Sequence, residues 1–147
     1  MPINKEMNGS NKIKTIDLIT QAIHAQQQKQ NEMSLLIEHA HTFVSARLET
    51  ENHIGAVVSM KQFLKYESIK EQATRAIAAL NALLNAVQAV DEDRFAIRPE
   101  DYEKAVRQIL AMPPPPLNLD DKSEILARAT AKRIKSAARL QEGSRAA

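Results

Sequence analysis

Two long stretches of this chain repeat apolar residues at alternating steps of three and four, the spacing that places side chains along one face of an α-helix. The first stretch predicts a helix from about Thr15 to about Thr50, and the second predicts a helix from about Ile54 to Val90. Residues 51–55 form the only break between them. At 1.5 Å per residue each helix is about 50 Å long, and two helices of equal length favour an antiparallel hairpin.

The two apolar seams are specific enough to name the expected hairpin core. A polar layer interrupts the first seam at Gln26 and Gln30, and Arg47 ends it. Polar seam positions cost stability and are tolerated where they specify register or partner. The first seam contains Ile16, Ile19, Ile23, Met33, Ile37, Ala40 and Val44. The second contains Val57, Met60 and Leu64, then, after a change of phase, Tyr66, Ile69, Ala73, Ala76, Leu80, Leu83, Val87 and Val90.

Composition supports an all-α fold and excludes several functional classes. Aromatic residues make up only 3% of the chain, and few turn-forming glycines are present, which disfavours a β-sandwich or barrel. The absence of Cys excludes disulfides, Cys-based zinc sites and thiolate nucleophiles. No secretory signal is expected, and no segment approaches the roughly 20 apolar residues that span a bilayer. We therefore expect a cytoplasmic protein, with any membrane contact peripheral.

Two shorter helices are predicted after the hairpin. The third begins near Pro99 and ends near Met112, because the four prolines 113–116 cannot continue it. The fourth is expected from a cap at Asp120 to about Leu140. The proline run contains Pro-x-x-Pro and could dock on a partner, although stiff spacers are commoner. The predicted organisation is a flexible leader 1–12, the hairpin with the third helix 13–112, a polyproline spacer 113–117, and a basic helix and tail 118–147.

No catalytic signature is recognisable in the chain. Glu38-His39-Ala40-His41 includes one Glu-x-x-His, the spacing used in di-iron bundles, but no second copy occurs, and neither His24 nor His53 supplies it. There is no glycine-rich phosphate loop, nucleophile elbow or His-Glu-x-x-His motif. We therefore predict no catalytic residue, no metal and no cofactor, and a protein that is not an enzyme.

The fourth helix carries a basic stripe and no acidic residue between residues 125 and 140. Such a face can be simply solvated, can bind a partner or an anionic membrane, or can bind nucleic acid. No aromatic residue interrupts it as single-stranded nucleic-acid binding favours, so nucleic acid ranks below membrane. The stripe consists of Arg128, Lys132, Lys135 and Arg139.

The segment from Glu51 to Gln72 resembles the start of the second helix in the ESCRT-III membrane-remodelling subunits. That resemblance covers about residues 15–95 and is carried by Ala56, Met60-Lys61, Lys65-Tyr66-Glu67 and Gln72. It implies a non-enzymatic subunit that assembles beside related chains on a membrane, with Lys61, Lys65 and Lys70 available to anionic lipid. The basic C-terminal part differs from the acidic one of that family.

The sequence as a whole predicts a non-enzymatic interaction or scaffold subunit. Such a subunit assembles with partners or with itself through long amphipathic helices, in the manner of coiled coils. It can serve membrane remodelling or trafficking. The alternative is a protein that binds an anionic surface, membrane or nucleic acid, through its basic C-terminal helix. The residues expected at a partner interface are Met33, Leu36, Phe43, Phe63, Tyr66 and Leu80.

Overall fold

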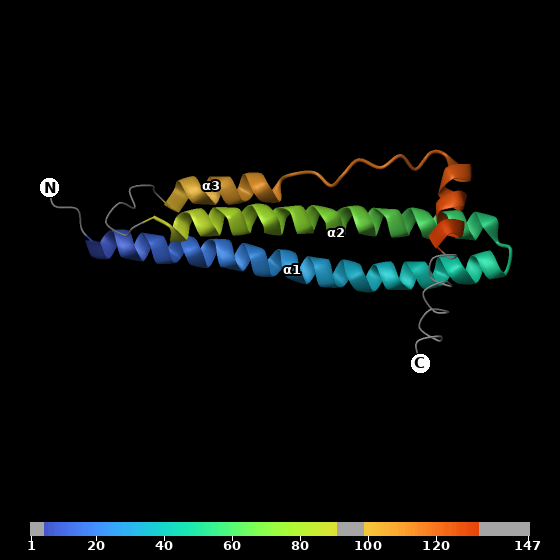
Figure 1. Ribbon diagram of the computed structural model, residues 1–147, viewed down its shortest axis with the longest axis horizontal. Coiled ribbons are helices and arrows are strands. Elements are labelled where there is room, and N and C mark those ends of the chain that lie inside the picture. The colour runs from blue at the N-terminus through green and yellow to red at the C-terminus, as the bar shows by residue number, and fades with distance from the viewer. Residues whose placement is uncertain (1–4, 91–98, 133–147) are drawn as a thin grey trace. The chain divides into compact units, whose positions relative to one another are not determined.

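The computed structural model describes residues 5–90 and 99–132, and every regular element in those ranges is a helix (Figure 1). The all-α class predicted from the sequence is therefore confirmed. The helices are α1 (Lys5–Glu49), α2 (His53–Gln88), α3 (Pro99–Leu110) and a further helix over residues 122–132. Residues 112–121 between the last two are not helical, which confirms the break expected at the proline run.

The chain divides into two compact units, each built from segments distant in sequence. Unit 1 contains the described parts of Met1–Asn31 and Lys70–Pro115, and unit 2 contains those of Glu32–Ile69 and Pro116–Ala147. Each unit therefore takes one part of α1, one part of α2 and one short helix. This division differs from the single body predicted over residues 13–112, because each short helix packs on its own part of the two long helices.

Unit 1 buries an aliphatic core between α1, α2 and α3. Ile19, Leu80 and Val87 are fully buried, and Val106 adds the contribution of α3. Lys12 Nζ on α1 donates hydrogen bonds to the carbonyls of Gln88 and Val90 at the end of α2, where a helix dipole favours a cation. The two segments run antiparallel, since Lys12 meets the end of α2 and later residues of α1 meet earlier residues of α2.

The polar layer predicted at Gln26 and Gln30 lies within unit 1, where Gln30 and its neighbour Lys29 bond to α2. Gln30 Nε2 donates to Thr74 Oγ1 at 2.8 Å. Lys29 Nζ donates to Gln72 Oε1 at 3.4 Å, and Gln72 Nε2 donates to the Met112 carbonyl just beyond α3. These bonds link α1 to α2 and α2 to the segment just after α3.

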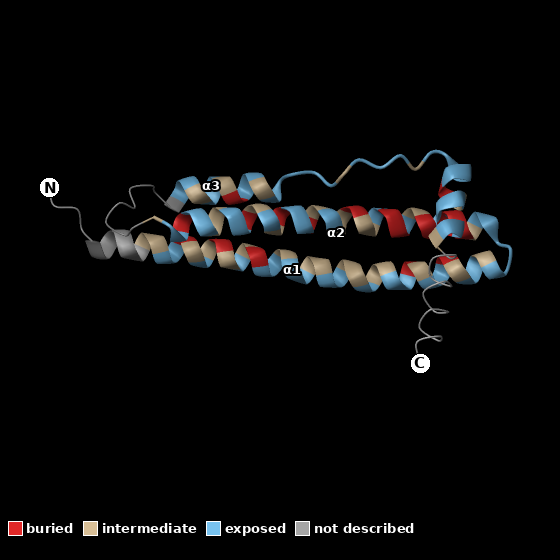
Figure 2. Ribbon diagram, in the orientation of Figure 1, coloured by how far each residue is buried: buried red, intermediate tan, exposed pale blue. Residues whose placement is uncertain are grey.

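Unit 2 builds a second core between α1, α2 and the 122–132 helix. Figure 2 shows buried positions recurring along α2, as the predicted seam requires. Ile125 and Ala129 complete the core from the 122–132 helix, on a face that the sequence reasoning did not identify. The buried residues of this core are Ala40, Val44, Val57, Met60, Phe63, Leu64, Ile125 and Ala129.

The turn between α1 and α2 needs only residues 50–52, fewer than the five predicted. The Asn52 N–H donates to the Arg47 carbonyl at 2.8 Å, and the Glu51 N–H donates to Leu48 at 3.1 Å, which is a Schellman motif. Glu51 takes the left-handed conformation that this motif requires, with φ of 57°. Asn52 then caps α2, its Oδ1 accepting the Gly55 N–H at 3.0 Å. One residue thus ends α1 and starts α2.

Two predicted boundaries are wrong. α1 begins at Lys5 rather than near Thr15, so the leader expected over residues 1–12 is helical from residue 5 onwards. Gly9 lowers helix propensity by only about 1 kcal/mol, and neighbouring helix formers offset that cost. The 122–132 helix is capped by Asp121, whose Oδ1 accepts the Glu124 N–H, and not by Asp120. The expected continuation of this helix to Leu140 lies outside the described residues.

Candidate interaction surface

Unit 2 exposes large apolar side chains although its core is closed. Leu35 and Phe43 on α1 are 60% and 58% exposed, and Ile54 and Val58 on α2 are 82% and 55% exposed. Such side chains on a small unit are typical of a surface that another molecule covers. Of the four, the sequence reasoning named only Phe43. The other three lie off the two seams, where a periodic pattern gives no signal.

The remaining residues predicted at a partner interface fall into two groups. Met33, Leu36 and Tyr66 are partly buried and keep some accessible surface. Phe63 is 3% exposed in unit 2 and Leu80 is 0% exposed in unit 1, so both belong to intramolecular cores. These two positions are corrected: the third helix covers Leu80 and the 122–132 helix covers Phe63, and neither is accessible to a partner in this fold.

A groove of about 390 Å³ lies beside the turn in unit 2, between the start of α2 and the start of the 122–132 helix. We call it the turn groove. Its apolar lining includes the two exposed side chains of α2 together with one buried and one partly buried residue. Its polar lining comes from two lysines, one histidine and one serine. The lining residues are His53, Ile54, Val57, Val58, Lys61, Lys122, Ser123 and Leu126.

The charge of the turn groove is basic. Lys61 and Lys122 are its only formally charged lining residues, and neither takes part in the ion pairs found among the described residues. Glu124 lies close to Lys122 in sequence but its carboxylate pairs with Arg128 at 3.0 Å. The Asp121 carboxylate is used as the helix cap. The groove therefore offers an apolar floor with cationic side chains on its rim.

A second exposed surface of unit 2 lies on α1, and we call it the α1 stripe: Glu32, Leu35, Leu36, Glu38 and Phe43. Leu35 stands between two acidic residues, each three positions away, which is one helical turn in either direction. Phe43 lies eight positions from Leu35, about 12 Å along the helix. All except Leu36 are classed as exposed. The α1 stripe is therefore apolar with acidic flanks.

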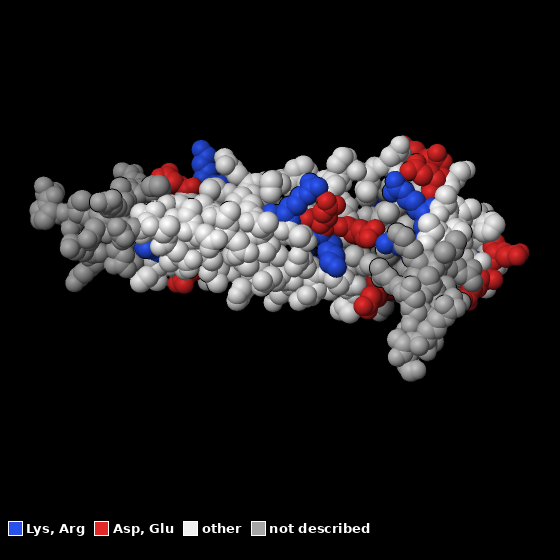
Figure 3. Space-filling view, in the orientation of Figure 1, with Lys and Arg blue, Asp and Glu red and all other residues white. Residues whose placement is uncertain are grey.

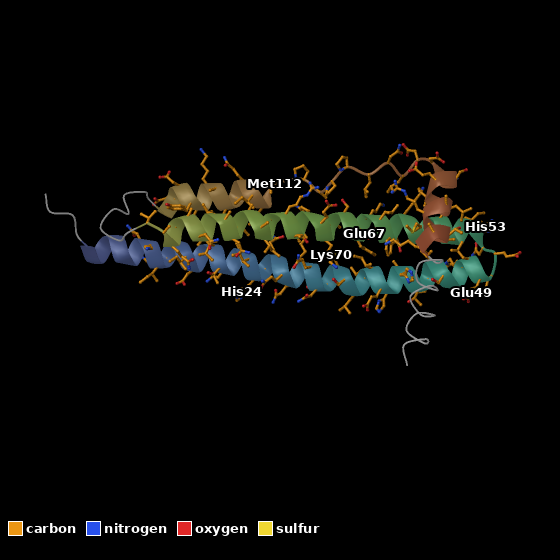
Figure 4. The ribbon with its side chains drawn as sticks, viewed as in Figure 1. His24, Glu49, His53, Glu67, Lys70 and Met112 are labelled. Atoms are coloured by element: carbon orange, nitrogen blue, oxygen red, sulfur yellow. The ribbon has the colours of Figure 1, made fainter. Side chains whose placement is uncertain are left out.

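Two of the seven basic residues predicted to contact an anionic surface form ion pairs within unit 2. Arg128 pairs with Glu124, and Lys132 Nζ lies 3.6 Å from Glu67 Oε2 on α2 (Figure 4). The same ammonium stands 4.6 Å from the centre of the Phe63 ring, a cation–π contact that holds the 122–132 helix on α2. Half of the predicted stripe is thus engaged within unit 2.

The other predicted basic residues have different surroundings. Lys65 is exposed on α2, and Lys61 lines the turn groove. Lys70 is partly buried and belongs to unit 1. Lys135 and Arg139 lie outside the described residues. The structure therefore brings together Lys61 and Lys122 at the turn groove. Lys122 was not predicted, because the adjacent Asp121 cancels its charge in the sequence.

The histidines gather no metal-binding set within the described residues. Groups of three or more His, Asp or Glu side chains that could hold an ion are not found in those ranges. His39 is exposed, and the His41 ring stands 6.3 Å from the Phe63 ring, packed at the edge of the unit 2 core. His53 is the first residue of α2 and Glu49 is the last residue of α1, so both lie next to the turn (Figure 4).

None of the helices in the described ranges has both the length and the apolar character that crossing a bilayer requires. Comparison with known proteins finds no matching family model, no matching curated protein and no matching solved structure. The resemblance of residues 15–95 to ESCRT-III subunits therefore stays a prediction. The case for a function rests on the surfaces of the two units.

Proposed function

We propose that this protein is a non-enzymatic scaffold subunit that assembles with copies of itself through its two long helices. The single observation that supports the proposal is the set of large apolar side chains exposed in unit 2: Leu35, Phe43, Ile54 and Val58. Burying such side chains contributes about 25 cal/mol per Å² of apolar surface removed from water. In this proposal α1 and α2 act as one long antiparallel hairpin that presents these side chains to the next subunit.

The contact differs from the mechanism expected from the seams. The seams themselves are covered within the chain by α3 and by the 122–132 helix, so they leave little apolar surface for another molecule. The proposed contact instead uses side chains outside the seams. Assembly then leaves both intramolecular cores intact, and folding and association are separable steps.

The alternative function, binding of an anionic membrane or nucleic acid through the basic C-terminal helix, receives less support. In its described part, Arg128 and Lys132 are already paired with carboxylates, and an anionic surface would have to displace them. Service in membrane remodelling or trafficking, in the cytoplasm or peripherally on a membrane, remains part of the proposal through the resemblance alone.

Light scattering coupled to size exclusion tests self-assembly. We expect the full chain to form a dimer or larger species at micromolar concentration, and Leu35→Gln with Phe43→Gln to return it to a monomer. Ile13→Gln is the matched control, because Ile13 is 59% exposed in unit 1 and has no place in the proposed contact. A full chain that stays monomeric at every concentration, or an Ile13 variant that dissociates equally, contradicts the proposal.

A further inference from the structure

We infer that the turn groove of one copy takes the α1 stripe of a second copy. This inference rests on the proposed function and specifies its contact. The groove is an apolar depression about two helical turns long, running along α2 from Ile54 to Lys61, or about 10 Å. Leu35 and Phe43 span a similar length on α1. Leu36 and Phe43, seven positions apart, have the spacing with which an amphipathic helix anchors in an apolar groove.

The apolar parts of the two surfaces complement each other. Val57 and Leu126 form the inner part of the groove, and Ile54 and Val58 stand exposed beside them. An aromatic or leucine side chain entering this space would remove all four from water. Fully burying a side chain such as Phe or Leu contributes about 1.5–3 kcal/mol.

The charges select which surface enters the groove. Lys61 and Lys122 on the rim have no ion-pair partner among the described residues, and neither do Glu32 and Glu38 of the α1 stripe. Docking the stripe would place two carboxylates opposite two ammonium groups at the edge of an apolar contact. Docking of one groove onto another would instead oppose lysines to lysines, which electrostatics disfavours.

The contact is heterologous, because the groove and the stripe are made of different residues. Each copy that gives its stripe to one neighbour keeps its groove for another. Heterologous contacts close into a ring where the rotation between copies allows it, and otherwise extend into an open chain. The inference therefore predicts species larger than a dimer that grow with protein concentration, rather than a self-limited pair.

Charge reversal in the full chain tests this contact. One variant, Lys61→Glu with Lys122→Glu, gives the groove an acidic rim. A second variant, Glu32→Lys with Glu38→Lys, gives the stripe basic flanks. The matched control for the groove variant is Lys14→Glu with Lys104→Glu, which makes the same change in net charge at exposed sites of unit 1. Circular dichroism checks that each variant keeps its helices, and sedimentation velocity measures assembly.

We expect each of the two variants alone to assemble at least about tenfold more weakly than the natural chain, because like charges then oppose each other. We expect their equimolar mixture, and the chain carrying all four substitutions, to regain assembly, since opposite charges meet again. The Lys14 and Lys104 control should assemble normally. Rescue by mixing is expected only from a contact between two different surfaces.

Four results overturn the inference. Variants that assemble like the natural chain show that the contact lies elsewhere, and self-assembly as such then survives. A mixture that stays as weak as its components excludes a groove-to-stripe contact. Loss of co-sedimentation with phosphatidylserine-containing vesicles in the Lys61 and Lys122 variant, with its assembly unchanged, assigns the groove to an anionic membrane. A natural chain that never assembles removes the proposed function together with this contact.

Discussion

The two units are built from the same pair of helices, yet they present different surfaces. In unit 1, neither 18–28 of α1 nor 76–90 of α2 contains an Asp, Glu, Lys or Arg, and the exposed residues of 76–90 are all Ala, Asn or Gln. Figure 3 shows a broad white area over these parts of α1 and α2, with charged side chains along its edges. Small and amide side chains at exposed positions give a partner little to bury.

Unit 2 exposes larger apolar side chains on these two helices. Its core is closed by a short helix, as in unit 1, but large apolar side chains remain outside that core and charges flank them. One pair of amphipathic helices can therefore provide both a folding core and a surface for association. The seam positions are used for folding in both units, whereas on α1 and α2 of unit 2 Leu35, Phe43, Ile54 and Val58 are large, apolar and exposed at positions off the seam.

The largest expected effect separates core from surface. Leu80→Ala removes a fully buried side chain from the unit 1 core and should lower the free energy of unfolding by about 2–5 kcal/mol. Leu35→Ala makes the same chemical change at an exposed site of unit 2 and should alter the free energy of unfolding by less than about 0.5 kcal/mol. Urea denaturation of dilute protein measures both. Equal destabilisation would mean that Leu35 belongs to the folding core.

The turn gives a smaller effect, confined to unit 2. Asn52→Ala removes the cap of α2 and should cost about 1 kcal/mol of stability. Glu51→Gly should act in the opposite direction by up to about 1 kcal/mol, because glycine adopts the left-handed conformation without steric strain. Hydrogen exchange should place both changes in the helix ends near residues 48–56. An unchanged stability in both variants contradicts the Schellman motif and cap described for this turn.

The contact of Lys132 with Phe63 and Glu67 gives the next effect. Lys132→Gln should reduce stability by about 0.5–1 kcal/mol, since it removes a cation–π contact and a half-exposed ion pair. Arg75→Gln in unit 1 is the comparison, because its pair with Glu71 lies on the surface within α2 and should contribute less than about 0.5 kcal/mol. Thermal melting of both variants measures the difference. A larger effect from Arg75 reverses the expected order.

The smallest effect is a pH dependence in unit 1. Burial, followed by the charge of Asp101, raises the pKa of the Tyr102 phenol above its usual value of 10.0. The neutral phenol's contribution to stability is therefore complete below about pH 10 and is lost as the pH rises through the folded pKa. Comparing the natural chain with Tyr102→Phe should give a constant stability difference at neutral pH that changes above pH 10. A stability difference between the two proteins that is the same below and above pH 10 contradicts the raised pKa of Tyr102.

Much of the fold follows from the sequence because periodicity identifies helix faces. Many seam positions become buried residues of the two cores, among them Ile19, Ile23, Ala40 and Val44 on α1 and Val57, Met60, Leu64, Ala73, Ala76, Leu80 and Val87 on α2. The start of α3 at Pro99 also follows from local rules. Periodicity does not indicate how much of the remaining helix surface will be covered by a segment distant in sequence. That is why Phe63 and Leu80 were expected at a partner interface.

The candidate surface was harder to predict for the same reason. Ile54 reads as part of the turn, and Leu35 and Val58 read as isolated apolar residues beside the seams. Lys122 lies among acidic residues, so the net charge of its segment does not indicate a basic site. The turn groove exists only because the 122–132 helix packs beside the start of α2, a contact between segments more than sixty positions apart. Only the tertiary arrangement brings these residues together.

Methyl NMR across a dilution series tests the central claim most directly, because it reports on each unit of the intact chain separately. We expect the methyl signals of Leu35, Ile54 and Val58 in unit 2 to shift or broaden as the protein concentration rises, while those of Ile19 and Leu80 in the unit 1 core stay unchanged. Concentration-dependent shifts centred on unit 1, or signals that are independent of concentration throughout, would contradict an assembly formed through unit 2.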